Sequence, residues 1–279
     1  MINKEDLLGK IDKTLINIKS RTPLTHCITN FVTVNDCANA ILAIGGSPIM
    51  ADDADEMEEV VSIADALVIN IGKLSKDQIA AMISASKVAN KTKTPIILDP
   101  VGVGVSNLRN NTALEIINNY NISAIRGNIT EIKTIAKLLG IIDENNTAKG
   151  VDVCVDDIIT KTNLKDNGKI ISNLAKKLNA IVLASGPIDL LSDGITTLAI
   201  DNGDEMMPLI TGSGCMLSSI VGTCIGGSTP LEGTLLAILA MNIAGEKARA
   251  KIDEKDEGTG SFREIGRAHV WTPVTPTDL

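Results

Sequence analysis

Aromatic side chains are almost absent from this chain, whose 279 residues include one Trp, one Tyr and two Phe. Platforms that stack nucleobases or sugar rings are built from aromatic side chains, so they have few residues to use here. Hydrophobic residues still make up 44% of the chain. We therefore predict a core of Ile, Leu, Val, Ala and Met, an aliphatic ligand pocket, and enough core for one large α/β domain or two smaller ones.

Positive charge is also scarce, because 26 Lys and Arg stand against 34 Asp and Glu, a formal net charge of -8. Nucleic acids are bound through clustered cations, so a DNA or RNA role is disfavoured. No apolar run reaches the roughly 18 residues that a membrane span needs, and no apolar signal region opens the chain. We expect a cytoplasmic protein with neither a nucleic-acid nor a membrane partner.

Several chemical signatures are missing as well. The five cysteines form no CxxC pair, which disfavours zinc sites and disulfide scaffolds and fits reduced thiols in a cytosol; they are Cys27, Cys37, Cys154, Cys215 and Cys224. There is no GxxxxGK[ST] phosphate loop, and residues 102–104 lack the third glycine of a dinucleotide fingerprint. No GxSxG elbow accompanies His26, which we assign to a structural or substrate-loop role.

What is present is an alternation of helical patterns and short aliphatic strands. The spacing of apolar residues predicts helices over residues 4–19, 34–43, 56–64, 76–90, 108–118, 130–139 and 168–178. Strands are predicted over residues 48–50, 66–71, 95–100, 122–126 and 181–184. Residues 24–30 are too short a stretch to assign. Unbroken aliphatic strands are covered on both faces, so the pattern indicates an α/β fold, a doubly wound and mostly parallel sheet with helices on both faces.

The alternation indicates a single domain over residues 1–264. Residues 265–279 show no periodicity and carry the one Trp, Trp271. This segment resembles the translation of a sequencing adapter that was read as part of the gene. We therefore predict that it is a non-native tail and leave it out of the fold prediction.

The sharpest local motif is TGSGC at residues 211–215, a glycine-rich turn that runs into an apolar helix. Gly212 and Gly214 let backbone N–H groups converge at a helix N-terminus, where the helix dipole stabilises negative charge. Cys215 is placed just before the helix body, where its pKa is expected to fall toward neutrality. The alternatives are a plain strand-to-helix turn and a buried, inert thiol.

A second motif, RGNxxE, joins a strand end to a helix at residues 126–131. Asn128 and Glu131 lie one helical turn apart, where they could hold hydrated Mg²⁺ while Arg126 contacts phosphate. A capping box explains the same spacing, and the two interpretations are compatible.

The third motif is Asp99, at the end of a buried strand and before Pro100. Doubly wound sheets place ligand-facing residues there, so the carboxylate could serve a metal or catalysis; ordinary turn chemistry is the alternative.

Together these motifs resemble the hydroxyethylthiazole kinase family, in order, over nearly all of residues 23–262. The stretches that carry the resemblance are THCITN (25–30), GGSPIMA (45–51), ALVINIG (66–72), ILDPVG (97–102), AIRGN (124–128) and TGSGC (211–215). The resemblance implies a ribokinase-like fold and ATP- and Mg²⁺-dependent phosphorylation of 4-methyl-5-(2-hydroxyethyl)thiazole in thiamine salvage. It also implies a homotrimer with active sites between subunits.

The resemblance further implies roles for single residues. Met50 and Gly212 match substrate-contacting positions, and Asn30 is expected near the same pocket. Arg126 and Ser185 match nucleotide-binding positions, the latter more often Thr in the family, while Asp99, Asn128 and Glu131 would handle magnesium and phosphates. Cys215 matches the catalytic position, where most ribokinase relatives have Asp. Family members continue after Phe262 with an apolar helix, which the tail is expected to lack or replace.

Two other functions stay open on the sequence. Another ribokinase-like kinase, such as a hydroxymethylpyrimidine kinase, would share the phosphate and magnesium residues but need a different pocket. A non-catalytic nucleotide- or thiazole-binding regulator would keep the fold without turnover.

Overall fold

The computed structural model describes residues 4–142 and 158–270. Its strands are β1 (Leu24–Ile28), β2 (Ser47–Ile49), β3 (Ala66–Asn70), β4 (Ile96–Asp99), β5 (Ala124–Asn128), β6 (Ile181–Ser185), β7 (Asp189–Ser192) and β8 (Thr197–Ile200). Its α-helices are α1 (Lys4–Arg21), α2 (Val34–Ile44), α3 (Met57–Ile63), α4 (Lys76–Thr92), α5 (Asn107–Asn119), α6 (Ile129–Leu138), α7 (Leu164–Leu178), α8 (Ser213–Gly226), α9 (Pro230–Lys255) and α10 (Thr259–Val270). Two short 3₁₀ helices are η1 (Ala54–Glu56) and η3 (Met207–Leu209).

The strands form one eight-stranded sheet in the order β2-β1-β3-β4-β5-β6-β7-β8. Strands β1 to β6 are parallel, and β7 and β8 join antiparallel at one edge. The predicted mostly parallel α/β sheet is therefore confirmed. In such a sheet the carboxyl ends of the parallel strands share one edge, where ligands usually bind.

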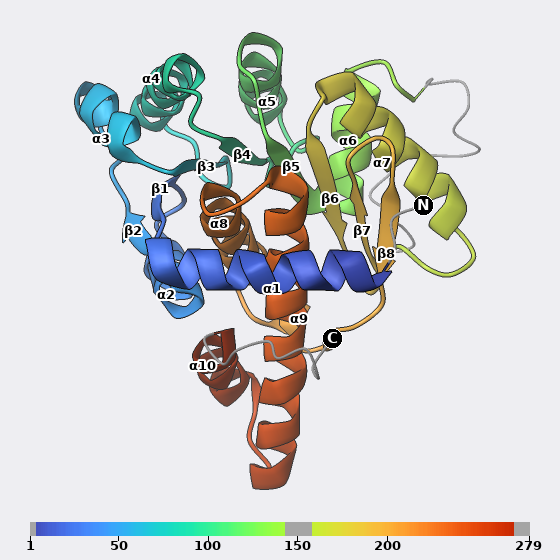
Figure 1. Ribbon diagram of the computed structural model, residues 1–279. Helices are drawn as coiled ribbons and strands as arrows, with labels where there is room; N and C mark the ends of the chain where they lie inside the picture. The colour runs from blue at the N-terminus through green and yellow to red at the C-terminus, as the bar shows by residue number, and fades with distance from the viewer. Residues whose placement is uncertain (1–3, 143–157, 271–279) are drawn as a thin grey trace.

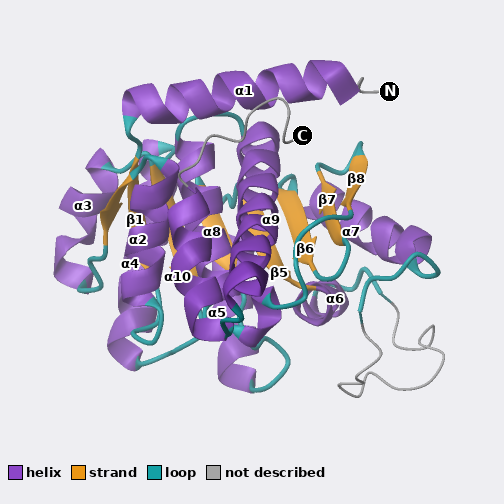
Figure 2. Cartoon of the chain, turned by 90° about the horizontal axis from the view of Figure 1, so that it is seen from below, coloured by secondary structure: helices purple, strands orange, loops and turns teal. Residues whose placement is uncertain are grey.

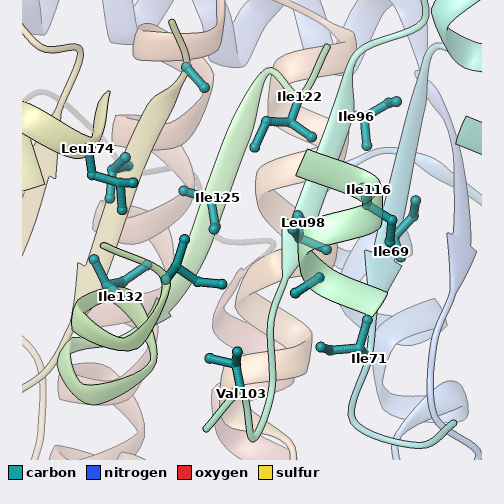
Figure 3. Close-up of a cluster of buried hydrophobic side chains, with 14 of the residues drawn as sticks. Ile69, Ile71, Ile96, Leu98, Val103, Ile116, Ile122, Ile125, Ile132 and Leu174 are labelled. Carbon is teal, nitrogen blue, oxygen red and sulfur yellow. The ribbon is translucent and has the colours of Figure 1, made fainter. Parts of the chain in front are cut away.

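Helices cover both faces of the sheet (Figure 1). Alternate residues of a strand point to opposite faces. Leu67 and Ile69 of β3 join the core under α3 to α7, whereas Ala66 and Val68 join the core under α1, α2, α8 and α9. Figure 3 shows the first of these cores, in which aliphatic side chains from β3, β4 and β5 meet those of the covering helices.

Helix α8 lies very close to the sheet, against β1, β3 and β4. A Cβ on Gly222 would stand 2.3 Å from Cγ2 of Val68, so only glycine allows this approach. On the same helix Thr223 shares a buried hydrogen bond with Thr25 of β1, with 2.9 Å between the hydroxyl oxygens. These contacts hold the C-terminal half of α8 tightly against the sheet.

Every element predicted from the sequence is present, with ends shifted by a few residues. The untyped stretch at 24–30 contains β1, and the sequence pattern did not predict β7, β8 or α9. Helix α9 packs against α1, α8 and α10, so its buried residues do not form a single stripe.

The C-terminus contains a helix that was not predicted. Residues 265–270 were left out of the fold prediction because they show no periodicity, but α10 runs through them. Phe262 is 2% exposed, and Arg263 forms an ion pair with the buried Asp36 of α2. Figure 2 shows α10 alongside the other helices of this face. Residues 271–279 lie outside the described ranges, and a non-native origin of the tail stays a prediction.

Two further observations concern the chain as described. No described helix is both long and apolar enough to cross a membrane. Cys27, Cys37, Cys215 and Cys224 are free thiols, while Cys154 lies outside the described ranges.

Candidate active site

The carboxyl edge of the parallel strands gathers most of the predicted site residues. The register places the end of each parallel strand beside that of its neighbour, as in the pairs Asn70↔Asp99 and Asn128↔Ser185. The polar residues at or just after strand ends are Asn30 after β1, Asn70 on β3, Asp99 on β4, Asn128 on β5 and Ser185 on β6. Met50 directly follows β2 at the same edge.

The N-terminus of α8 meets this edge. Gly212 is the residue before the helix and has φ 89°, a left-handed conformation that favours glycine. A Cβ there would also stand 2.5 Å from Cγ2 of Thr33. A Cβ on Gly214 would stand 2.5 Å from Nη1 of Arg126. The helix start, with its unpaired N–H groups, therefore lies directly against a guanidinium group, which is a favourable place for an anion.

Cys215 is the third residue of α8 rather than the last residue before it. Its sulfur lies 3.4 Å from Nδ2 of Asn30 and 3.2 Å from Nδ2 of Asn70. Burial raises the pKa of the thiol, as does the charge of Asp99, while hydrogen bonds from Thr33 and the two amides lower it. The predicted fall in pKa is therefore wrong, because burial and a nearby carboxylate disfavour the thiolate.

Asp99 is fully buried at the end of β4. Its Oδ2 accepts hydrogen bonds from Asn70 and Ser218, both at 2.7 Å, whereas its Oδ1 has no hydrogen-bond donor among the described residues. Burial raises the pKa of Asp99 to about 7, with Arg126 and the two donors opposing the shift and Glu131 adding to it. Oδ1 is thus a buried acceptor with spare capacity.

Arg126 connects the carboxylate to the neighbouring strand. Its Nη1 is 4.0 Å from Oδ1 of Asp99, and its Nη2 donates to Oγ of Ser185 at 2.5 Å. The Arg126 side chain is 11% exposed, and its Nε has no hydrogen-bond acceptor in the described ranges. A buried guanidinium with a free N–H group can bind an anionic oxygen.

The RGNxxE motif forms the capping box that was one interpretation of its spacing. Oδ1 of Asn128 accepts from the Glu131 N–H, and Oε2 of Glu131 accepts from the Asn128 N–H, each at 2.8 Å. The other oxygen, Oε1, accepts from the Gly102 N–H at 2.9 Å. Within residues 4–142 and 158–270, no three His, Cys, Asp or Glu side chains gather as a metal site. A magnesium role for these residues stays a prediction.

The segment that carries Met50 is held by His26. The imidazole Nε2 lies 2.8 Å from the carbonyl oxygen of Ala51, which can only accept, so this nitrogen donates. Burial lowers the pKa of His26. Its Nδ1 is buried without a partner in the described part of the chain. His26 therefore supports the segment after β2, in line with the structural role predicted for it.

Sequence reasoning missed three residues that organise the site. Asn70 bridges Asp99 and Cys215, and Ser218 ties Asp99 to α8. Arg109 donates to the carbonyl groups of Ile71, Val101 and Gly72, which holds the loops after β3 and β4 together. Asn70 had one available signal: it is a polar residue at the end of an apolar strand, the same position that singled out Asp99.

Comparison with solved structures defines the class of the fold. A ribokinase-like superfamily protein from Enterococcus faecalis V583 aligns with a TM-score of 0.58 and 13% identity, covering 90% of this chain and 88% of that chain. At that identity the likeness concerns the fold alone, and the fold is ribokinase-like.

Comparison with proteins of higher sequence identity identifies the family. The hydroxyethylthiazole kinase family model matches residues 15–265. Hydroxyethylthiazole kinase of Methanobrevibacter smithii is 70% identical over 263 residues, 94% of this chain and 92% of the relative. The structure of hydroxyethylthiazole kinase from Pyrococcus horikoshii OT3 aligns with a TM-score of 0.81 and 33% identity, covering 94% of this chain and 93% of that one. The chain belongs to the hydroxyethylthiazole kinase family.

Proposed function

We propose that the protein transfers the terminal phosphoryl group of ATP to the primary alcohol of 4-methyl-5-(2-hydroxyethyl)thiazole, as a step of thiamine salvage. The observation that carries this proposal is the convergence of the α8 N-terminus, Arg126 and Cys215 at one edge of the sheet. Family membership supplies the substrate class, and the geometry supplies the chemistry.

Phosphoryl transfer needs mainly positioning and stabilisation of negative charge. The N–H groups at residues 213–215 point out of the first turn of α8, and Arg126 lies against Gly214. These donors would hold the migrating phosphoryl group, while Ser185 keeps the guanidinium in place through its hydroxyl. Met50, Asn30 and Gly212 would line the thiazole side, and Asn128 and Ser185 the nucleotide side.

Cys215 would take the proton of the attacking alcohol. A loose transition state asks little of the base, so the small thiolate fraction of a thiol with a raised pKa can suffice. In this step the alcohol oxygen forms a bond to the terminal phosphorus, and the bond between that phosphorus and the ADP oxygen breaks. The alcohol proton moves to the sulfur.

The carboxylates at the edge fit a magnesium ion that is held largely by phosphates and water. Mg²⁺ is usually bound through one or two carboxylates together with substrate phosphates. Asp99 offers a buried oxygen that has no hydrogen-bond donor among the described residues, and Glu131 lies near enough for its charge to raise the pKa of Asp99. When bound, Mg²⁺ would neutralise charge that develops on the phosphates; Asp99 and Glu131 are the residues that would hold it.

A coupled assay of ADP release tests the proposal. Purified protein with ATP and Mg²⁺ should release ADP when the thiazole alcohol is added and should not do so with 4-amino-5-hydroxymethyl-2-methylpyrimidine. Turnover with the pyrimidine alone would indicate the other kinase. Binding of the thiazole alcohol without any ADP release would indicate a non-catalytic regulator and contradict the proposal.

We also propose a homotrimer with its active sites between subunits. Support comes from Phe31 and Val32, which directly follow Asn30 and are 66% and 59% exposed. Large apolar side chains beside a binding site are often covered by a partner. Light scattering on the purified protein should give three times the chain mass, and Phe31→Glu should reduce that mass and the activity together. A monomer with full activity would contradict this assembly.

A further inference from the structure

Asn70 is the one described side chain that contacts both the buried carboxylate and the thiol of the site. It is 1% exposed. Its Nδ2 donates to Oδ2 of Asp99 at 2.7 Å and lies 3.2 Å from the sulfur of Cys215. Its Oδ1 accepts from the Gly72 N–H at 2.9 Å and from Nδ2 of Asn30 at 3.4 Å. All of its hydrogen-bonding groups are therefore engaged.

These partners fix which way the amide faces. The Gly72 N–H can only donate, so the amide oxygen must point toward it. An ionised Asp99 can only accept, so the amide nitrogen must point the other way. The second N–H of that nitrogen then has one direction left, toward the sulfur of Cys215. The amide cannot flip without leaving both the Gly72 donor and the Asp99 carboxylate mismatched.

The arrangement also ties α8 to the sheet from two sides. Ser218, three residues after Cys215 in the sequence, donates to the same Oδ2 of Asp99 at 2.7 Å. Asp99 thus accepts from β3 through Asn70 and from α8 through Ser218. The charged and titratable groups around the sulfur are Asp99 on β4, Arg126 on β5 and Cys37 on α2.

We propose that Asn70 is a positioning residue for the transfer step: held by Asp99 and Gly72, its amide directs one N–H group at Cys215 and so orients the sulfur and stabilises its thiolate. This inference rests on the proposed function, because it assumes that Cys215 acts on the substrate alcohol. Asn70 itself acts through the sulfur and need not touch the substrate.

The competing interpretation is that Asn70 only fills space and satisfies the Gly72 N–H. Asn70→Asp and the uncharged Asn70→Ser together separate the two possibilities: Asp keeps the oxygen that faces Gly72 but loses the amide donors and adds a negative charge, whereas Ser loses the donors without adding charge. Ser86→Ala is the control, since Ser86 is also a fully buried polar side chain with one hydrogen bond, to the carbonyl oxygen of Met82 in α4, and lies outside the site.

The first measurement does not depend on turnover. The full chain is treated with iodoacetamide at pH 8, and alkylation of the peptide that contains Cys215 is followed by mass spectrometry. A hydrogen bond to a charged acceptor changes the equilibrium between thiol and thiolate by about 10- to 100-fold. Because the thiolate is the form that reacts, Asn70→Asp should slow alkylation by at least about 10-fold. Ser86→Ala should stay near the parent. Parent-like alkylation of Asn70→Asp would overturn the proposal.

The second measurement uses the reaction itself. Asn70→Asp should lower kcat by about 10-fold or more, as expected for a lost donor to a charged group, with little change in KM for ATP. In a Cys215→Ala background the same change should have little further effect, because both act on one group. Equal losses in the two backgrounds would show a role independent of the sulfur.

The two measurements also separate this inference from the proposed function. If the parent protein gives no turnover with the thiazole alcohol, the proposed function fails, yet the alkylation rates still report whether Asn70 controls Cys215. Thermal unfolding of each variant checks folding, and Asn70→Ser provides a smaller variant without the added charge if Asn70→Asp does not fold. Parent-like alkylation of a folded Asn70→Ser would count against the proposal in the same way.

Discussion

Gly214 has no room for a side chain because Arg126 occupies the space: a Cβ would stand 2.5 Å from Nη1 and 3.1 Å from Nη2. The start of α8 and the guanidinium therefore form one continuous donor surface. Gly214→Ala should push Arg126 away from it and lower kcat by about 100-fold, the order observed when one preorganised donor is lost. Steady-state kinetics with the thiazole alcohol measure this.

The control for this variant is Gly258→Ala, which adds a methyl group where no atom lies within 4 Å. Gly212→Val should abolish activity, because it combines a φ of 89° with a clash against Thr33. Gly140→Val has a comparable φ of 70° and open space around it, so it reports the backbone strain alone. Full turnover by Gly212→Val would discredit the anion-binding role of this turn.

Cys215→Asp should retain activity and extend it to lower pH. A base must be deprotonated to accept a proton, and burial together with Asp99 raises the pKa of the thiol. The kcat of the parent should therefore increase with pH above neutrality. A carboxylate at the same position ionises at lower pH, so the variant's profile should move down the pH scale.

The measurement is kcat between about pH 6 and 9, with unperturbed reference pKa values near 4 for Asp and 8.5 for Cys setting the range. Cys224→Ala removes another thiol of α8 that is fully buried, and its profile should follow that of the parent. A parent profile that is flat over this range, or an active Cys215→Asp whose profile does not move to lower pH, would remove the sulfur from the proton transfer.

The direction of this pKa also shows what the sequence can and cannot predict. The helix start next to Cys215 is determined by residues adjacent in the sequence, so the TGSGC motif predicted it. The carboxylate that raises the thiol pKa stands on β4, and only the folded sheet brings Asp99 near residue 215. Asp99 was singled out because it ends an aliphatic strand. Asn70 occupies the same position on β3. An Asn at a strand end is also a common turn residue, so the sequence alone does not show that its amide binds Asp99 and Cys215.

The fold follows the same division. Helices with one apolar face and strands with one aliphatic run were predicted. Their sequence pattern reflects how they pack, with one helix face on the sheet and both strand faces covered. Helix α9 was missed because it contacts helices on several sides. Strand β8 was missed because it is an edge strand with partly exposed positions, and β7 was missed although all four of its residues are buried. Burial set by several neighbours leaves no simple period in the sequence.

Asp99→Asn should change how stability depends on pH. The pKa of Asp99 is raised to about 7 in the folded protein, so the folded state holds this proton more tightly than the unfolded chain does. Its contribution to stability is therefore full below about pH 4 and is lost as pH rises toward 7. Between pH 5 and 7 the parent should lose about 2 kcal/mol through this group, at about 1.4 kcal/mol per pH unit.

Urea unfolding at a series of pH values gives the comparison. The Asn side chain does not titrate, so this loss should be missing from the variant. Asp189, whose pKa burial raises to about 6, and His26, whose pKa burial lowers, are present in both proteins and contribute to the slope that remains. Equal pH dependence of parent and variant would mean that Asp99 is not held in its protonated form by burial.

Arg263 should matter to stability although it lies far along the chain from the site residues. It reaches from α10 to Asp36, which is buried in the first turn of α2, and Phe262 beside it is 2% exposed. Removing one partner from an ion pair with a buried carboxylate is strongly destabilising, and because Arg263 is partly exposed we expect Arg263→Ala to lower the unfolding free energy by about 1–3 kcal/mol.

Two control variants test whether this loss of stability comes from the contact between α10 and α2. Lys91→Ala breaks an exposed ion pair with Glu58 and should change the melting temperature little. Removal of residues 271–279, part of the predicted tail at 265–279, should also change it little, because Phe262 and Arg263, which dock α10, lie before them. If the shortened chain unfolds as easily as Arg263→Ala, residues 271–279 contribute to the fold, which would count against the prediction that residues 265–279 are a non-native tail.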